Sequence, residues 1–420
     1  MTAKLSIVDV ERVVVDVPYT PRCQDWNARE IWQWRISEVI RVTTDAGIVG
    51  YGETILHYTW GRVPDEAIAQ VVGHNPADFL GDDSLGAGLQ MALYDVVGKA
   101  LGVPVYRLLN LPRVRQWCPI SWWNIDMPPE AFAAEAQEAL ARGYTSYKIK
   151  ARPWWDVYEQ VEAIGAVTPP HFRVDLDWNQ MLINAGNAEP VLSELGREER
   201  VAIYESPIMQ RDVEGLRQLR AKTTRPIALH FGNPPFPTVV RDEACDGFVI
   251  GGGVTRVLEQ GTLATAFDKP FWLQMVGTGL TTALSLHLGA VLPCAQWPAV
   301  NCLNIYTDDL LVEPLTIQDG YARVPDGPGL GIEVDEAALA RFEMEPPYEL
   351  PKPRLLLSIV WPGGRARHYA DIRQCWADAQ SGSIPAQERG VTLRVRRDDG
   401  SKQWAELYAR AERGPIIDRA

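Results

Sequence analysis

The sequence predicts an α/β protein whose central part is a (β/α)₈ barrel. Five short apolar runs each end in a side chain able to do chemistry, and most successive ends lie about 25–30 residues apart, the length of one strand, one helix and two loops. Such units close most naturally into a barrel, whose active site lies at the C-terminal ends of different strands. The five runs are residues 147–150, 172–177, 201–205, 226–230 and 270–274.

Residues 1–115 are predicted to form a separate α+β module. Residues 6–16 and 37–44 alternate between apolar and polar side chains as half-buried strands do, and a glycine-rich turn follows the second run. Residues 89–101 have the apolar period of an amphipathic helix, and glycine and proline follow directly after it. The first module therefore holds both strands and a long helix.

The barrel should span residues 116–312, with a sixth strand at 247–253. This sixth strand ends in glycines, whose backbone amides suit either an anion or a tight turn. Residues 313–345 are expected to return to the first module and complete it. Residues 346–420, entered through several prolines, are predicted to form a small C-terminal α/β segment of unknown role, with two strands and a helix between them.

Composition and charge narrow the class of protein. A chain of 420 residues is too long for one compact domain. With 41 basic and 54 acidic residues the net charge is −13, and no basic stripe indicates nucleic-acid or membrane binding. The six cysteines form no CxxC pair, and no apolar run reaches the roughly 20 residues of a membrane span. We expect a cytoplasmic protein with reduced thiols. The 15 tryptophans suit either sugar rings or packing at domain interfaces.

Two lysines share one strand. Lys148 and Lys150 lie two residues apart, so both side chains point to the same face of the sheet. Two ammonium groups this close should lower each other's pKa, which would leave one lysine able to accept a proton near neutrality. Such a base, beside a divalent cation that stabilises an enediolate, can remove the proton next to a carboxylate.

Acidic residues and a histidine end the following strands. Asp175, Asp177 and Asn179 share a face at period two, and one of them is the expected first metal ligand. Glu205 is the expected second ligand and His230 the third, because carboxylate oxygens and imidazole nitrogen are common ligands of divalent metals.

Several motifs give the chain a resemblance to a known family. The motifs are residues 50–53, 91–104, 148–150, 204–207 and 326–331. In this order they resemble the G-x-G-E, ALxDxxGKxLGxP, K-x-K, E-x-P and PGLG motifs of the enolase superfamily, in its mandelate racemase and muconate lactonising enzyme branch. The resemblance covers roughly residues 5–345. It implies an α+β capping domain over a modified TIM barrel, Mg²⁺, abstraction of a proton α to a carboxylate, and a homo-oligomer.

The resemblance also assigns roles to individual residues. The run 176–180 is similar to the family's D-x-N motif, which favours Asp177 over Asp175 as first ligand. Lys150 is then the base, and Lys148 helps to position the carboxylate or to lower the pKa of Lys150.

Three positions depart from the family pattern. At the position where the family usually has its third-ligand glutamate, this chain has Phe231, and His230 precedes it. The glucarate dehydratase branch has a non-acidic ligand at that earlier position, so His230 is the expected third ligand here. An imidazole ligand favours Mn²⁺, Fe²⁺ or Zn²⁺ over Mg²⁺. The seventh strand carries Gln274 where racemases have a catalytic histidine, and glutamine cannot shuttle a proton. The sixth strand has Ile250 and Gly251 where a lysine or aspartate would stand.

Together these features predict a metal-dependent lyase that dehydrates a sugar acid or related hydroxy acid, a small anionic carboxylate. The acid that helps hydroxide leave is open among Lys148, His57 and Tyr58. One alternative is an epimerase or cycloisomerase, with Tyr306 or a water on Asn304 as proton donor. Another is a barrel that binds a metabolite without turnover. The candidate substrate contacts are Trp26, Arg29, Tyr58, Trp60, Asn179 and Gln274.

Overall fold

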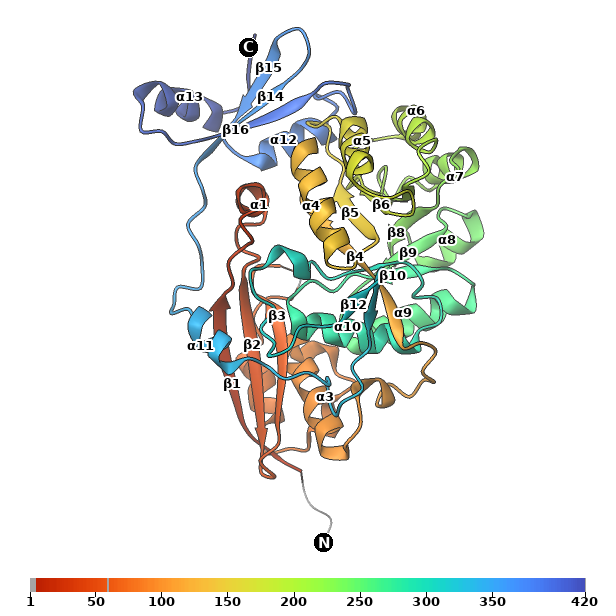
Figure 1. Ribbon diagram of the computed structural model, residues 1–420, viewed down its shortest axis with the longest axis vertical. Helices are drawn as coiled ribbons and strands as arrows, with labels where there is room; N and C mark the ends of the chain where they lie inside the picture. Colours follow the sequence, from red (N-terminus) through yellow and green to blue (C-terminus); the bar gives the residue numbers. More distant parts are fainter. Residues whose placement is uncertain (1–4, 59, 420) are drawn as a thin grey trace.

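The computed structural model describes residues 5–58 and 60–419 (Figure 1). An antiparallel sheet of order β1-β2-β3 and three helices form the N-terminal capping domain, called the cap below. The predicted long helix is present as α3 and ends at Gly102, whose left-handed φ of 66° suits glycine. The bounds are β1 Ile7–Asp16, α1 Gln24–Glu30, β2 Ile36–Thr44, β3 Val49–Ile55, α2 Asp65–Val71 and α3 Ala87–Leu101.

Two glycines allow α3 to lie directly on β3. A Cβ atom at Gly52 would lie 2.0 Å from the Gly88 carbonyl oxygen, and one at Gly50 would lie 2.5 Å from the Ala92 carbonyl oxygen. No larger residue fits such contacts with backbone, so the glycines of the G-x-G-E motif set the distance between helix and strand.

The predicted barrel is confirmed. Strands β4 to β10 are parallel neighbours in order, and β11 pairs with β4. An isolated bridge between Gln274 and Val300 links the end of β10 to β11, which closes the ring. The strands are β4 Trp117–Asn124, β5 Ser146–Lys150, β6 Arg173–Asp177, β7 Val201–Glu205, β8 Ile227–His230, β9 Gly247–Ile250, β10 Phe271–Leu273 and β11 Ala299–Val300.

Helices follow the first seven of these strands and cover the outside of the barrel (Figure 1). Their apolar faces and the strands form one large core that extends into the cap. The helices are α4 Pro129–Ala141, α5 Val157–Val167, α6 Ala185–Leu195, α7 Val213–Lys222, α8 Phe236–Asp242, α9 Val254–Ala266 and α10 Gly279–Val291.

Beyond the barrel the chain returns past β4 to the cap. Strands β12 Ile317–Gln318 and β13 Tyr321–Arg323 form a hairpin, and β13 pairs antiparallel with β4. Helix α11 Glu336–Phe342 then packs near β1.

Two buried carboxylates join the cap to the rest of the chain. Asp95 on α3 accepts hydrogen bonds from the backbone N–H of Tyr51 at 2.9 Å and of Leu330 at 2.8 Å. Glu53 accepts from the backbone N–H and the hydroxyl of Thr278, and from the hydroxyl of Thr281 at 2.9 Å. Glu53 thereby satisfies donors at the start of α10 with a charge that the helix dipole favours.

The last part of the chain forms an antiparallel sheet of order β16-β14-β15-β17 with two helices, the C-terminal unit (top of Figure 1). Its apolar side chains form a core with Trp154, Trp155 and Met181 of the barrel loops. The bounds are β14 Leu355–Val360, β15 Arg365–Tyr369, α12 Ile372–Gln380, β16 Thr392–Arg397, α13 Lys402–Glu412 and β17 Ile416–Arg419.

Asp126 holds this junction together. Its Oδ2 accepts from the indole N–H of Trp154 at 2.7 Å and of Trp155 at 2.8 Å, and lies 2.8 Å from Arg29 Nη2. The guanidinium of Arg152 lies near the same carboxylate and 4.5 Å from the ring centroid of Trp376 in α12. Trp154 and Trp155 of the barrel therefore form the packing surface for the C-terminal unit.

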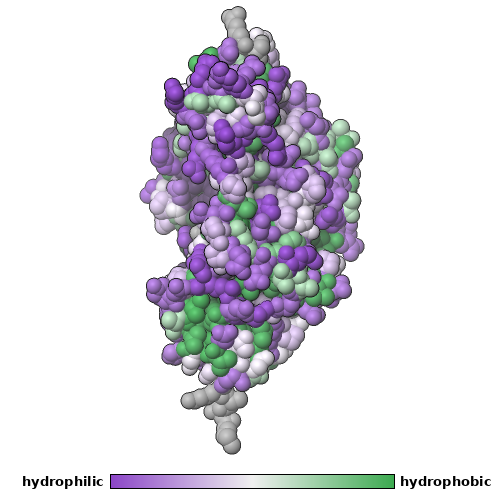
Figure 2. Space-filling view, turned by 90° about the vertical axis from the view of Figure 1, so that its left-hand side faces the viewer, coloured by the Kyte–Doolittle hydropathy of each residue, from purple (hydrophilic) through white to green (hydrophobic). Residues whose placement is uncertain are grey.

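No described helix is long and apolar enough to cross a bilayer. Figure 2 shows the face that lies on the left in Figure 1. Hydrophilic residues cover most of the C-terminal unit at the top, and hydrophobic residues gather in the lower part over the cap.

The substitution Asp126→Asn should lower the free energy of unfolding by about 3–5 kcal/mol, because it leaves the buried Arg29 without a counter-charge. Urea unfolding followed by tryptophan fluorescence measures the change. The control is Glu214→Gln, which breaks an exposed pair with Arg217 and should leave the midpoint nearly unchanged. Equal effects of both substitutions would contradict the role given to Asp126.

Acid should destabilise the protein through His287. Burial lowers the pKa of this histidine to about 4, against about 6.5 in the unfolded chain. The unfolded state therefore binds the proton more readily, and stability that is present above pH 6.5 is lost as the pH falls toward 4, by up to about 3 kcal/mol. The measurement is the unfolding free energy against pH. A His287→Gln variant should show a shallower acid slope; identical slopes would contradict the assignment.

Candidate active site

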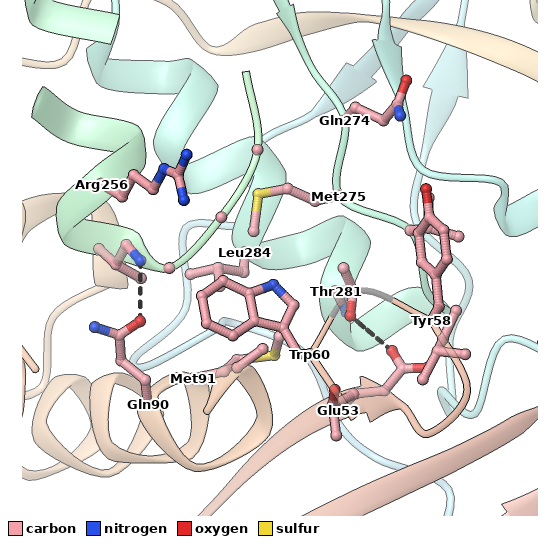
Figure 3. Close-up of a pocket in the computed structure, with 18 of the residues that line it drawn as sticks. Glu53, Tyr58, Trp60, Gln90, Met91, Arg256, Gln274, Met275, Thr281 and Leu284 are labelled. Carbon is pink, nitrogen blue, oxygen red and sulfur yellow. Dashed lines mark hydrogen bonds between the residues drawn. The ribbon is translucent and has the colours of Figure 1, made fainter. Parts of the chain in front are cut away.

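A cavity of about 500 Å³ lies between the cap and the ends of strands β8 to β10 (Figure 3). The cap contributes aromatic and polar side chains, among them Tyr58, Trp60 and Gln90. The barrel contributes His230 and Gln274 at strand ends. Such a concave, partly apolar space with a few polar groups is the usual setting of a small-molecule site.

Lys148 lies deep beside this cavity and is fully engaged. Its ammonium nitrogen lies 2.5 Å from Glu205 Oε2 and 3.3 Å from Asp177 Oδ2, and it donates to Gln274 Oε1 at 2.8 Å. The side chain is 1% exposed. Of its three N–H donors, one makes the hydrogen bond to Gln274, and the carboxylates of Glu205 and Asp177 lie against the ammonium as ion pairs.

Lys150 is the more accessible of the two lysines. Its side chain is 13% exposed, and its ammonium lies 2.5 Å from Asp177 Oδ2 and 6.0 Å from the ring centroid of Trp123. Strand β5 thus presents both lysines to one face, as the period of two predicted, but only Lys150 retains contact with solvent.

The expected mutual lowering of lysine pKa values is wrong for Lys148. Burial opposes its charge, but the adjacent carboxylates of Glu205 and Asp177 outweigh burial and raise the pKa above its ordinary value. Burial likewise opposes the charge of Asp177, while Lys150 and Lys148 hold the pKa of that carboxyl well below its usual range. The two carboxylates therefore favour the charged form of Lys148.

The neighbouring Asp175 differs from Asp177. Burial raises the pKa of Asp175 to about 7, and its contact with a hydroxyl is long, at 3.4 Å to Ser146 Oγ. Asp175 faces no lysine ion pair of the kind that Asp177 makes with Lys148 and Lys150. The choice of Asp177 as the functional aspartate fits this difference.

His230 lies at the cavity wall. Its side chain is 46% exposed, and its Nε2 atom lies 3.1 Å from Glu205 Oε1. The next residue, Phe231, points into an aromatic cluster, with its ring centroid 5.2 Å from Phe236 and 4.9 Å from Phe248. The usual third-ligand position therefore carries a partly buried aromatic ring that packs against the core and lines the cavity.

The donor set does not fit a divalent metal as arranged here. The structure brings Asp177, Glu205 and His230 to one mouth, but in residues 5–58 and 60–419 no group of three acidic, histidine or cysteine side chains is placed to hold a metal ion. A divalent cation needs several such ligands around it. The space between Asp177 and Glu205 is taken by the ammonium of Lys148.

The predicted substrate contacts divide into two groups. Tyr58, Trp60 and Gln274 line the cavity. The other three lie at the junction with the C-terminal unit: Trp26 packs on Trp155, Arg29 pairs with Asp126, and Asn179 accepts from Arg152 at 2.8 Å.

Tyr58, one of the side chains considered as proton donors, lines the cavity, whereas Tyr306, Asn304 and His57 are engaged elsewhere. Tyr306 donates to the Trp34 carbonyl oxygen at 3.0 Å. The side-chain amide of Asn304 accepts from the backbone N–H of Trp123 and donates to the Trp123 carbonyl oxygen. His57 is exposed and bonds the Tyr348 carbonyl oxygen at 2.6 Å.

Sequence reasoning missed Arg256, which lies in the first turn of α9 and lines the cavity (Figure 3). No described side chain pairs with its guanidinium. The first backbone amides of α9, directly after the glycine-rich end of β9, donate to the side chains of Asp83 and Gln90, so these amides are not open to an anionic substrate. The signal that existed was an arginine just after a glycine run at a strand end.

Known proteins resemble this chain over most of its length. Residues 131–338 match the family model described as Enolase C-terminal domain-like. D-gluconate dehydratase of Thermoproteus tenax is 26% identical over 365 residues, which cover 74% of this chain and 70% of that protein. N-succinyl-L-Arg/Lys racemase of Bacillus cereus is 25% identical over 338 residues, which cover 72% of this chain and 89% of that protein.

Solved structures agree. Muconate cycloisomerase from Pseudomonas fluorescens superposes with a TM-score of 0.65 at 25% identity, covering 81% of this chain and 99% of that chain. 2-Chloromuconate cycloisomerase from Rhodococcus opacus gives a TM-score of 0.66 at 22% identity, and the match covers 82% of this chain and 100% of that chain. The chain therefore belongs to the mandelate racemase and muconate lactonising enzyme branch of the enolase superfamily.

Proposed function

We propose that this chain is a lyase that removes the proton α to the carboxylate of a sugar acid or related hydroxy acid and then eliminates water. The observation that carries the proposal is Lys150, a partly exposed lysine at a barrel strand end that Asp177 holds at 2.5 Å. Relatives named D-gluconate, D-xylonate and D-galactonate dehydratase support this choice of reaction.

In the proposed reaction Lys150, an ammonium in the resting site, first loses its proton to solvent; its neutral amine then accepts the α-proton, and Asp177 pairs with the ammonium that results. The electron pair of the broken C–H bond moves into the carboxylate to form an enediolate. Its return breaks the bond from the β-carbon to oxygen, and the hydroxyl leaves as water after it receives a proton. His230 lines the cavity with its Nε2 atom 3.1 Å from Glu205 Oε1, and we assign it as the donor of that proton.

The two ends of the cavity would hold the two ends of the substrate. Lys148 fixes the amide oxygen of Gln274, which leaves the amide N–H groups for a substrate oxygen near the reacting carbon. Arg256 would bind the far end of the substrate, because its guanidinium has no partner among the described side chains and can bind a carboxylate or hydroxyl oxygens.

An isomerase is the second candidate. Lys150 and His230 are proton-carrying groups on different strands, β5 and β8, and two such groups can add and remove a proton at one carbon. Relatives named as a racemase and a muconate cycloisomerase favour this reading. Deuterium at the α-carbon without loss of water would identify an isomerase, whereas a 2-keto-3-deoxy product would identify the lyase.

Replacement of Lys150 by Met should reduce kcat by about 10²–10⁴-fold, because a positioned base contributes that much. A panel of sugar acids, assayed for 2-keto-3-deoxy products, provides the measurement. Lys222→Met, on the surface helix α7, is the control and should keep full activity. A Lys150→Met enzyme as fast as the parent would rule out the proposed base.

Replacement of Arg256 by Met should raise KM about tenfold or more and change kcat little, because a charge-assisted hydrogen bond contributes about 1.5–3 kcal/mol. Arg256→Lys should fall in between, since it keeps the charge and loses the planar fork. Arg241→Met, at an exposed site on α8, is the control. A KM unchanged in Arg256→Met would remove Arg256 from the binding site.

A further inference from the structure

A buried ammonium lies where the family implies a metal ion. Lys148 contacts Glu205 at 2.5 Å and Asp177 at 3.3 Å. By the resemblance, these carboxylates are the first two metal ligands. All three side chains are at most 1% exposed. Lys148, which lies on β5, thus bridges the acidic residues at the ends of the next two strands, β6 and β7.

A third residue completes the shell around this cation. Gln274 Oε1 accepts from Lys148 at 2.8 Å, and the ring centroid of Trp272 lies 5.3 Å from the ammonium nitrogen. Gln274 follows β10, on the far side of the barrel from β6 in strand order. It therefore has a definite task at a position where other family members carry a catalytic histidine: it binds the ammonium.

Charge balance opposes a second cation at this place. Asp177 and Glu205 carry two negative charges, and the ammonium groups of Lys148 and Lys150 that contact them carry two positive charges. A divalent ion between the carboxylates would place four positive charges against two negative ones in a buried site. Like charges at such distances repel strongly where water is excluded. A metal could enter only if a lysine withdrew.

The third ligand is missing as well. Phe231 occupies the usual position and packs against Phe236 and Phe248. Among the acidic side chains that the structure describes, the His230 ring pairs with Glu205 alone, at 3.1 Å. Two carboxylates neutralised by lysines and one half-exposed imidazole do not form the cage of oxygen ligands that Mg²⁺ requires.

We infer that Lys148 is the resident cation of this site and that the chain holds its acidic strand ends together without a divalent metal. The ammonium does the positioning work of the ion, whereas the substrate carboxylate is left to the amide N–H groups of Gln274. The inference concerns metal binding alone and does not depend on which reaction the site performs.

The test is a metal titration of the purified full-length chain without substrate. Wild-type protein stripped with chelator is titrated with Mn²⁺ by electron paramagnetic resonance and with Mg²⁺ by calorimetry. We expect no stoichiometric site with a Kd below about 1 mM. Lys148→Met removes the competing cation and leaves the carboxylate pair, so it should bind Mn²⁺ at least tenfold more tightly than wild type. Lys150→Met is the matched control and should gain less, because Lys148 stays in place.

Stoichiometric Mn²⁺ on the wild type at micromolar Kd, lost in Asp177→Asn, would overturn the inference whether or not the Lys148 variant folds. If Lys148→Met is not folded by circular dichroism, Glu205→Gln serves as the second variant. It leaves the ammonium short of one charge and should lower the unfolding midpoint equally with and without 10 mM MgCl₂. The inference would also be overturned if MgCl₂ raised the unfolding midpoint of the wild type and NaCl of equal ionic strength did not. A failed dehydration assay bears on Lys150 and leaves these binding results intact.

Discussion

The barrel mouth depends on one buried ammonium group. Lys148 is the point at which β5, β6, β7 and the end of β10 are joined, through Asp177, Glu205 and Gln274. Burial of a charge is costly unless partners replace its water, and here two carboxylates and one amide oxygen surround the ammonium. The three acceptors are in turn held by the lysine. None of the four side chains can be altered alone without leaving a charge or a polar group unpaired in the core, so they constrain one another.

The strongest sequence motifs turn out to serve architecture more than chemistry. The carboxylate of Asp95 joins α3 to β3 and to the backbone at Leu330. Gly98 lets that helix approach the returning chain, since a Cβ there would lie 2.7 Å from Gly329 Cα. Glu53 fastens the cap to the start of α10. These contacts hold the cap over the barrel, and the cavity between them exists because they do.

The fold was predictable because its signals are local and periodic. Apolar runs at the barrel period located the strands, and a period of two placed Lys148 and Lys150 on one face. The hydrogen bonding of Lys148 was not predictable, because its acceptor Gln274 is 126 residues away along the chain. The tryptophans at 154 and 155 were ambiguous for the same reason: their partner Asp126 carries no pattern that ties it to them. Arg256 was missed because a polar residue in the first turn of a helix looks like any solvated one.

The C-terminal unit has a consequence for the order of events during synthesis. Trp154, Trp155 and Met181 belong to the barrel, yet their apolar cover is made by residues from 355 onward. At ribosomal rates of 5–20 residues per second, the first of these residues waits for roughly tens of seconds before its cover has been made. During that interval the nascent barrel exposes indole rings and the ion pairs around Asp126. A chain that stops early leaves the ribosome with this surface still open, which makes it a ready substrate for chaperones and proteases.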